Sequence, residues 1–241
     1  EGNLALGYTC YHVPEALLNV GNCFSVRLRA PHTGSIDIAT YYMSNYTCEF
    51  ARALVERGIE GGYQFLDAMI GVDACSMMNR AMEHFEILKV NDKPNFFVTH
   101  CDIPYKITDY TLDSYVKQMR IHVLDKLTEV YGVDTSDAAI RQAVAEHNEV
   151  CSIISEMAEM RKAENPVITG YEFHVINLVT YVCPKALILP YLRETLKELK
   201  KRKPDEKSPF RARVAIVGSE IDDPQLTKLI EGCGALVVSD R

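Results

Sequence analysis

Two cysteines, Cys48 and Cys75, have the residue type and the spacing that metal chemistry would need in this sequence. Each is expected near the start of a helix, and the apolar segment 65–72 between the two helices is expected to be a buried strand. In open α/β folds, ligands usually bind at the carboxyl edge of the sheet, where such helices begin. A helix N-terminus favours the thiolate, which is the ligand of iron–sulfur clusters. Spacing alone leaves two interpretations open: a pair of cluster ligands, or two inert thiols.

The other six cysteines are weaker candidates. Cys10 could approach a cluster bound at Cys48 and Cys75, although packing is the favoured interpretation. Cys101 follows the apolar segment 95–100 and is also expected to pack, since free cysteine is among the most often buried residue types. The remaining four lie within predicted strands or helices and are expected in the core: Cys23, Cys151, Cys183 and Cys233.

Three polar residues near the expected edge could do acid–base chemistry: His12, Glu15 and His32. Such residues are more often caps or surface groups, so we assign no catalytic residue from the sequence. The charged run at 200–213 contains a basic cluster that could face an anionic ligand such as a coenzyme phosphate. A solvated linker is the favoured interpretation of this run.

The composition excludes several classes of protein. The 241 residues carry 26 Lys and Arg against 33 Asp and Glu, and the net charge of −7 argues against general nucleic-acid binding. No apolar run approaches the roughly 18 residues that a membrane span needs. No signal segment is recognised, so we expect a cytoplasmic location and reduced thiols. The cysteines form no CxxC pairs, which argues against zinc ribbons and thioredoxin-like sites.

The first part of the chain alternates predicted strands and helices. Strands are expected at 23–30, 65–72 and 95–100, with a helix capped by Ser44 and another at 76–88. The segment from Gly7 is expected to be a loop running into a short helix, and 31–39 a loop. This order predicts an α/β fold with a parallel, Rossmann- or flavodoxin-like sheet in a first domain, 1–108, that carries both candidate cysteines.

Residues 109–203 are predicted to be a helical insertion packed on the first domain, with long amphipathic helices at 110–131 and 134–164. Residues 204–241 then read as the first strand–helix–strand unit of a second, truncated α/β domain. Because two strands alone rarely form a stable sheet, we expect the parent chain to continue beyond Arg241. No GxGxxG or P-loop motif indicates a nucleotide site.

Several segments in order carry a resemblance to a known family. They are GYTCYHVPEALL, VRLRAP, SNYTCEFARALVERG, YQFLDAMIGVDACSMMNR, FVTHCDIP and VGSEIDDPQLTKLIEGCGALVVSDR. Together they resemble the 2-hydroxyacyl-CoA dehydratase family, whose relatives include class I benzoyl-CoA reductase subunits and double-cubane cluster proteins. The resemblance runs from about residue 5 to the last residue.

The resemblance implies a [4Fe–4S] cluster between two similar α/β domains, held by three cysteines. Two of these match Cys48 and Cys75, and the third would lie just beyond Arg241, so this fragment alone is expected to be inactive. The implied enzyme is a lyase that eliminates water from a 2-hydroxyacyl-CoA through a ketyl radical. The implied partners are an acyl-CoA substrate, a homologous second subunit and an ATP-dependent activator that donates one electron; neither nucleic acid nor membrane is expected. A reductase of the benzoyl-CoA or double-cubane type and a non-catalytic, cluster-carrying paralogue stay open as alternatives.

Overall fold

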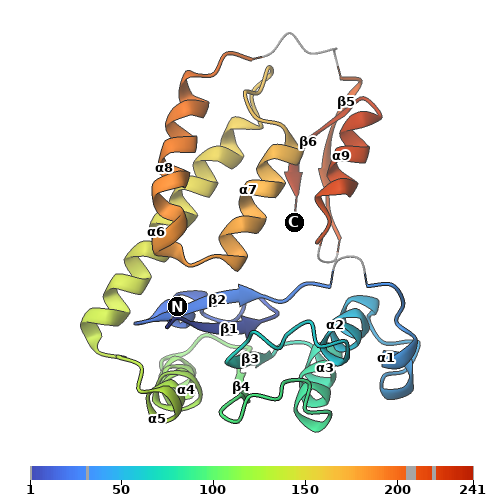
Figure 1. Ribbon diagram of the computed structural model, residues 1–241. Coiled ribbons are helices and arrows are strands. Elements are labelled where there is room, and N and C mark those ends of the chain that lie inside the picture. The colour runs from blue at the N-terminus through green and yellow to red at the C-terminus, as the bar shows by residue number, and fades with distance from the viewer. Residues whose placement is uncertain (1, 31–32, 205–209, 219–220, 241) are drawn as a thin grey trace. The chain divides into compact units, whose positions relative to one another are not determined.

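A four-stranded parallel sheet forms the centre of the first of two compact units, Glu1–Val144 (Figure 1). The computed structural model describes residues 2–30, 33–204, 210–218 and 221–240. The sheet has the order β2-β1-β3-β4, and every neighbouring pair is parallel. Its strands are β1 (Leu4–Tyr8), β2 (Cys23–Arg27), β3 (Ala68–Asp73) and β4 (Phe97–Asp102). The predicted α/β class and parallel sheet are confirmed.

Strand β1 was not predicted, and it lies next to the centre of the sheet between β2 and β3. Its side chains are buried from Ala5 to Tyr8. Gly7 is packed so closely that an added Cβ would lie 2.8 Å from Leu66 Cδ1. A strand covered on both faces shows no polar–apolar alternation, so the five residues LALGY give no periodic signal.

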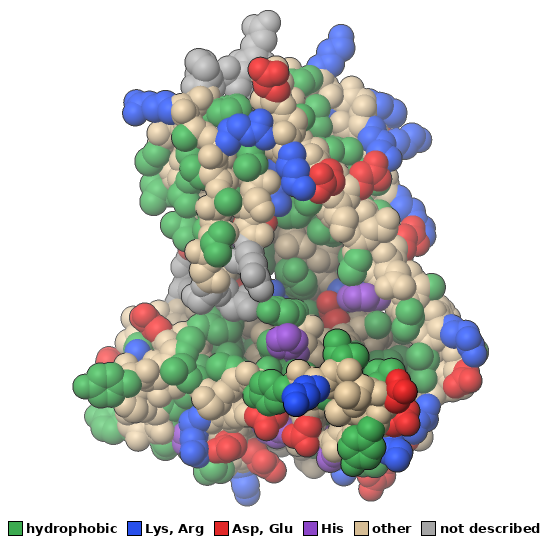
Figure 2. Space-filling model, turned by 180° about the vertical axis from the view of Figure 1, so that it is seen from behind, with side chains coloured by type: hydrophobic (Ala, Val, Ile, Leu, Met, Phe, Trp, Pro, Cys, Tyr) green, Lys and Arg blue, Asp and Glu red, His purple; other side chains and the backbone are tan. Residues whose placement is uncertain are grey.

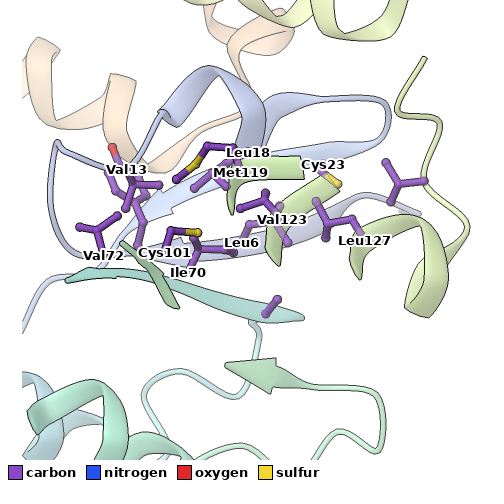
Figure 3. Close-up of a cluster of buried hydrophobic side chains, with 13 residues drawn as sticks. Leu6, Val13, Leu18, Cys23, Ile70, Val72, Cys101, Met119, Val123 and Leu127 are labelled. Carbon is purple, nitrogen blue, oxygen red and sulfur yellow. The ribbon is translucent and has the colours of Figure 1, made fainter. Parts of the chain in front are cut away.

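The two faces of the sheet pack against different helices. The even-numbered residues Leu6, Ile70 and Val72 join one buried cluster, drawn in Figure 3. On the other face Gly71 lies against Met82 of α3 (Ser76–Ile87). Because successive residues of a strand point to opposite faces, this division follows from the strand period of two.

The first predicted amphipathic helix is confirmed as three consecutive helical segments. These are α4 (Asp109–Met119), a π-helical turn η2 (Arg120–Asp125) and α5 (Lys126–Tyr131). Met119, Val123 and Leu127 enter the buried cluster of the sheet. Gly132 ends the run in a left-handed conformation, φ 67°, which glycine adopts without steric cost.

Three short helical elements complete the first unit. The turn η1 (Glu15–Asn19) precedes β2, and α1 (Asp37–Tyr42) and α2 (Glu49–Ile59) lie between β2 and β3. Helix α1 corrects the expected loop at 31–39; residues 31 and 32 lie outside the described residues. Helices α2 and α3 pack closely, since a Cβ on Gly58 would lie 2.8 Å from Phe85.

The second compact unit, Ala145–Arg241, is built from helices and a two-stranded sheet. Helix α6 (Asp137–Met160) continues into it and packs with α7 (Gly170–Val182) and α8 (Lys185–Lys201) through a buried apolar cluster (Figure 1). Strands β5 (Ala212–Ile216) and β6 (Ala235–Asp240) are parallel and joined by α9 (Pro224–Gly232), the order expected for a βαβ unit. The three-part division into 1–108, 109–203 and 204–241 stays a prediction. In the described part of the chain, no helix has the length and apolar character to cross a membrane.

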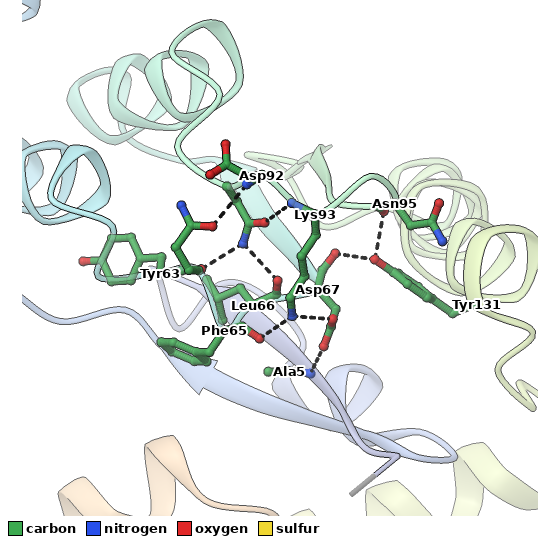
Figure 4. Close-up of polar contacts among 11 residues, drawn as sticks. Ala5, Tyr63, Phe65, Leu66, Asp67, Asp92, Lys93, Asn95 and Tyr131 are labelled. Atoms are coloured by element: carbon green, nitrogen blue, oxygen red, sulfur yellow. Dashed lines mark hydrogen bonds and ion pairs between the residues drawn. The ribbon is translucent and has the colours of Figure 1, made fainter.

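A polar network joins the amino edge of the first sheet to α5 (Figure 4). The Asp67 carboxylate accepts hydrogen bonds from the Ala5 N–H and the Lys93 ammonium, both at 2.8 Å. The Tyr131 hydroxyl lies 2.7 Å from the carbonyl oxygen of Asp67 and 2.8 Å from that of Asn95. Burial, and then the charge of Asp67, raises the pKa of Tyr131 from 10.0 to about 12.

This raised pKa predicts a loss of stability in alkali. The folded chain keeps the Tyr131 proton up to about pH 12, whereas the unfolded chain releases it near the ordinary value of 10.0. The stabilisation is therefore complete below pH 10.0 and is lost as the pH rises toward about 12.

Urea unfolding at a series of pH values measures this decline in stability. Tyr131→Phe should make the decline smaller, and near neutral pH it should cost about 1 kcal/mol for the lost hydrogen bond. Tyr110→Phe, a change at an exposed tyrosine, should follow the wild-type curve. A Tyr131→Phe curve parallel to that of the wild type would contradict the prediction.

Candidate functional site

Cys48 and Cys75 each occupy the residue directly before a helix, at the start of α2 and α3 respectively. Strand β3 ends at Asp73, so Cys75 lies at the carboxyl edge of the parallel sheet. The expectation that Ser44 caps the first of these helices is wrong. Ser44 instead closes a turn, because its carbonyl oxygen accepts a hydrogen bond from the Thr47 N–H at 2.8 Å. The helix begins only after this turn.

The two helix starts are neighbours in space. The Cys48 N–H lies 3.2 Å from the Met77 Sδ and donates to it, and Met77 is in the first turn of α3. Cys48 is half-buried and Cys75 is exposed, so both are accessible from solvent. Neither cysteine side chain caps the N–H groups of its own helix. The site therefore combines two thiols with the positive ends of two helix dipoles.

The turn that carries Cys75 is held by hydrogen bonds from α3. The Asn79 N–H donates to the carbonyl oxygen of Cys75 at 2.9 Å. The Asn79 side-chain amide donates to the carboxylate of Asp73 at the end of β3. These contacts tie Cys75 to both the strand before it and the helix after it.

The two thiols suit an iron–sulfur cluster in donor chemistry, since thiolates are its usual ligands. They supply two ligands, and no group of three or more His, Cys, Asp or Glu that could hold a metal ion occurs among the described residues. A third ligand beyond Arg241, as the resemblance implies, would complete such a set. The fit is therefore partial: the ligand type is suitable, but the described residues supply fewer ligands than a cluster needs.

Two of the other cysteines are core residues, as predicted. Cys23 and Cys101 are both buried, and Cys101 lies within β4 rather than in the loop after it. Burial, and then the charge of Asp67, raises the pKa of Cys23 to about 12. Burial, and then the charge of Asp102, raises the pKa of Cys101 to about 11. Both thiols keep their protons at neutral pH, which makes them poor metal ligands.

The remaining cysteines divide between packing and the surface. Cys10 is half-buried and packs against the first cluster, as favoured from the sequence. Cys183 is half-buried at the end of α7. The expectation of core positions is wrong for Cys151 and Cys233, which are exposed. Cys151 lies on α6, where an apolar sequence pattern does not fix which face a single thiol occupies, and Cys233 lies in the turn directly after α9.

The polar candidates have structural contacts or surface positions. Glu15 accepts a hydrogen bond from the Ser25 hydroxyl at 2.7 Å, which fixes η1 on β2. His12 is exposed, with its ring 4.6 Å from that of Tyr11. His32 and residues 205–209 of the charged run lie outside the described residues. On the face drawn in Figure 2, acidic and basic side chains are interspersed.

Sequence reasoning missed Met77 and Arg52, which each make a hydrogen bond with the backbone of Cys48. Arg52 is a buried cation one turn after Cys48, on a helix whose other buried residues include Leu54 and Val55. A charged residue four positions after a cysteine, within an apolar helical face, was the signal available in the sequence. No sequence signal indicates the contact of Met77.

Comparisons with known proteins place these features in a wider context. A family model described as 2-hydroxyglutaryl-CoA dehydratase, D-component, matches residues 10–241. A benzoyl-CoA reductase subunit of Thauera aromatica is 20% identical over 243 residues, covering 98% of this chain and 60% of the relative. The (R)-phenyllactyl-CoA dehydratase beta subunit of Clostridium sporogenes is 20% identical over 240 residues, covering 99% and 62%. The beta subunit of (R)-2-hydroxyglutaryl-CoA dehydratase of Acidaminococcus fermentans is 20% identical over 201 residues, covering 83% and 52%. The chain thus spans little more than half the length of these relatives.

Proposed function

Because the chain belongs to the 2-hydroxyglutaryl-CoA dehydratase D-component family, we propose that it is part of an iron–sulfur subunit of a 2-hydroxyacyl-CoA dehydratase. The proposed reaction removes water from a 2-hydroxyacyl-CoA through a ketyl radical, after one-electron activation driven by ATP. The proposed partners are a homologous second subunit and an ATP-dependent activator, and the proposed location is the cytoplasm. Two relatives that are named as beta subunits of 2-hydroxyacyl-CoA dehydratases, from Clostridium sporogenes and Acidaminococcus fermentans, support the assignment.

One observation carries the proposal at the level of residues: the contact between the Cys48 N–H and Met77, which joins the starts of α2 and α3. Cys48 and Cys75 are 27 positions apart in the sequence, yet the helices that follow them start side by side. We assign both cysteines as ligands of a [4Fe–4S] cluster, with the third ligand beyond Arg241. When bound, such a cluster would supply low-potential electrons and an open iron position that polarises a substrate oxygen.

The chain's own residues would then have defined roles. Cys48 and Cys75 bind the cluster, and the N–H groups in the first turns of α2 and α3, which neither cysteine side chain caps, stabilise negative charge at the site. Asn79 orients the Cys75 turn through its two hydrogen bonds. The exposure of Cys75 leaves the site open to an incoming acyl-CoA or to a partner subunit.

The test uses the full parent protein, produced and purified without oxygen. Cys48→Ala and Cys75→Ala should each lower bound iron and sulfide by about tenfold, because a cluster that loses a thiolate ligand is held weakly. Cys151→Ala and Cys233→Ala, at exposed thiols on the other unit, serve as matched controls and should keep the wild-type iron content. Iron content unchanged in both Cys48→Ala and Cys75→Ala would refute the proposed site.

A second candidate function is a reductase of the benzoyl-CoA type, which the similarity to the benzoyl-CoA reductase of Thauera aromatica favours. Cys48 and Cys75 would serve both reactions, so these residues do not separate them. The two are distinguished by product analysis, with a 2-hydroxyacyl-CoA and an aromatic acyl-CoA offered in parallel. Cluster binding without turnover of either substrate would favour the third alternative, a cluster-carrying paralogue.

A further inference from the structure

Arg52 is a buried cation beside the candidate cluster site. It lies in α2 and is 9% exposed. Its N–H donates to the carbonyl oxygen of Cys48 at 3.1 Å, which places it one helical turn after the cysteine. Arginine is almost never buried without a partner, because desolvating a charge is costly. This burial therefore needs an explanation.

The contacts of the guanidinium account for only part of its hydrogen-bonding capacity. Its Nη1 donates to the Asn45 Oδ1 at 3.3 Å, while its Nε is buried and has no partner. No ion pair joins Arg52 to a carboxylate among the residues that the structure describes. The nearby Glu56, also buried, instead accepts a hydrogen bond from the Ala39 N–H at 2.6 Å.

The Arg52 side chain points toward the start of α2. Long side chains on a helix lean toward its N-terminus, and the contact with Asn45 places the guanidinium beside the turn at 44–47. That turn leads directly into Cys48. The guanidinium thus adds to the positive potential of the starts of α2 and α3, where no cysteine side chain caps the N–H groups.

We propose that Arg52 is a positioning residue for Cys48, an inference that rests on the proposed function. Acting through Asn45, it holds the turn that sets the position of Cys48. Its guanidinium also places a positive charge near the start of α2, where Cys48 lies. A cluster bound by thiolates is anionic, and nearby charge is one of the factors that set its reduction potential.

The two effects can be separated by substitution in the full parent protein. Arg52→Met removes both the clamp and the charge, whereas Asn45→Ala removes the clamp at an exposed residue and keeps the charge. Arg57→Gln is the matched control, since Arg57 lies on the same helix, is 47% exposed in its side chain and pairs with Glu60. Hydrogen exchange of the Thr47 amide, which donates to Ser44, measures the turn in cluster-free protein. Chelator-driven iron loss and the midpoint potential are measured on reconstituted protein.

The expected result is a distinct pattern for each variant. Arg52→Met and Asn45→Ala should both speed exchange at Thr47 by about tenfold, the effect of losing one hydrogen bond to a charged group. Only Arg52→Met should also make the midpoint reduction potential of the cluster more negative. Reduction adds negative charge to the cluster, and in this variant no guanidinium offsets it. Iron loss should be fastest in Arg52→Met and unchanged in Arg57→Gln.

Exchange at Thr47 that stays at the wild-type rate in both Arg52→Met and Asn45→Ala would overturn the clamp. A potential that is the same in Arg52→Met and Arg57→Gln would overturn the electrostatic part. If the wild-type protein binds no cluster, the proposed function fails by itself. The exchange measurement, made on cluster-free protein, still decides whether Arg52 holds the turn.

Discussion

Replacing Arg161 with methionine should lower the free energy of unfolding by about 3 kcal/mol, the low end of the cost of breaking a buried ion pair, because Arg161 is buried and its partner Asp240 is partly exposed. Arg161 is 4% exposed, and its two terminal nitrogens donate to the two carboxylate oxygens of Asp240 at 3.2 and 3.1 Å. The guanidinium also lies 3.7 Å from the centre of the Phe173 ring. Methionine preserves much of the apolar stem but leaves Asp240 without its counter-charge.

Urea unfolding followed by circular dichroism measures this loss. Adding Asp240→Asn to Arg161→Met should recover part of it, because no uncompensated charge then remains. Arg193→Gln is the matched control in the same unit, since Arg193 and Glu149 form an ion pair between exposed side chains, and it should leave the urea midpoint close to that of the wild type. An Arg161→Met midpoint that coincides with the Arg193→Gln midpoint would show that the pair contributes little.

The Arg161–Asp240 pair holds the end of β6, the strand that leads toward the proposed third cluster ligand. Asp240 is the last residue of that strand. If the third cluster ligand follows Arg241, as proposed, its segment starts from a strand end that a buried arginine holds in place. Sequence inspection gave no reason to connect residues 79 positions apart.

The candidate site was predictable in its main feature because helix starts leave strong local signals. The apolar run of β3 followed by the helix-forming segment SMMNRAMEHF located Cys75 at a helix start. The exact start of α2 was not predictable in the same way. Ser44 has the side chain of a typical cap, but its carbonyl oxygen closes a separate turn with Thr47 before the helix begins.

The strands were predictable where an apolar run is long, as in β3, or where apolar and polar residues alternate, as in β2. They were not predictable where a buried strand is short and lacks alternation. The strand β2 lies in the segment CFSVRLRA, in which apolar and polar residues alternate, and was recognised. The strand β1 is buried from Ala5 to Tyr8 and was missed, although it pairs with two neighbours. Long-range polar contacts were also beyond sequence reasoning. The Asp67 network becomes visible only when distant segments meet.

Gly170→Ala should be the second strongly destabilising change, with an expected loss of about 3 kcal/mol from overpacking. Gly170 is the first residue of α7, and its N–H donates to the Glu231 carboxylate at 2.8 Å. A Cβ at this position would lie 2.6 Å from the Val237 Cβ and 2.7 Å from the Val237 carbonyl oxygen. The carbonyl belongs to the backbone of β6, so relief requires α7 and β6 to separate.

The matched control is Gly232→Ala, at the last residue of α9, where an added Cβ meets nothing within 4 Å. This change should leave stability equal or raise it by up to about 1 kcal/mol, because alanine loses less backbone entropy than glycine in a helix. Glu231→Gln separates the clash from the cap. It keeps the shape but replaces one acceptor oxygen by an NH2 group, so one of the charge-assisted bonds from the Gly170 and Tyr171 N–H groups is lost and the other is weakened. Its cost should be smaller than that of Gly170→Ala. Equal urea midpoints for Gly170→Ala and Gly232→Ala would contradict the prediction, because they would show that α7 and β6 leave room for a Cβ beside Val237.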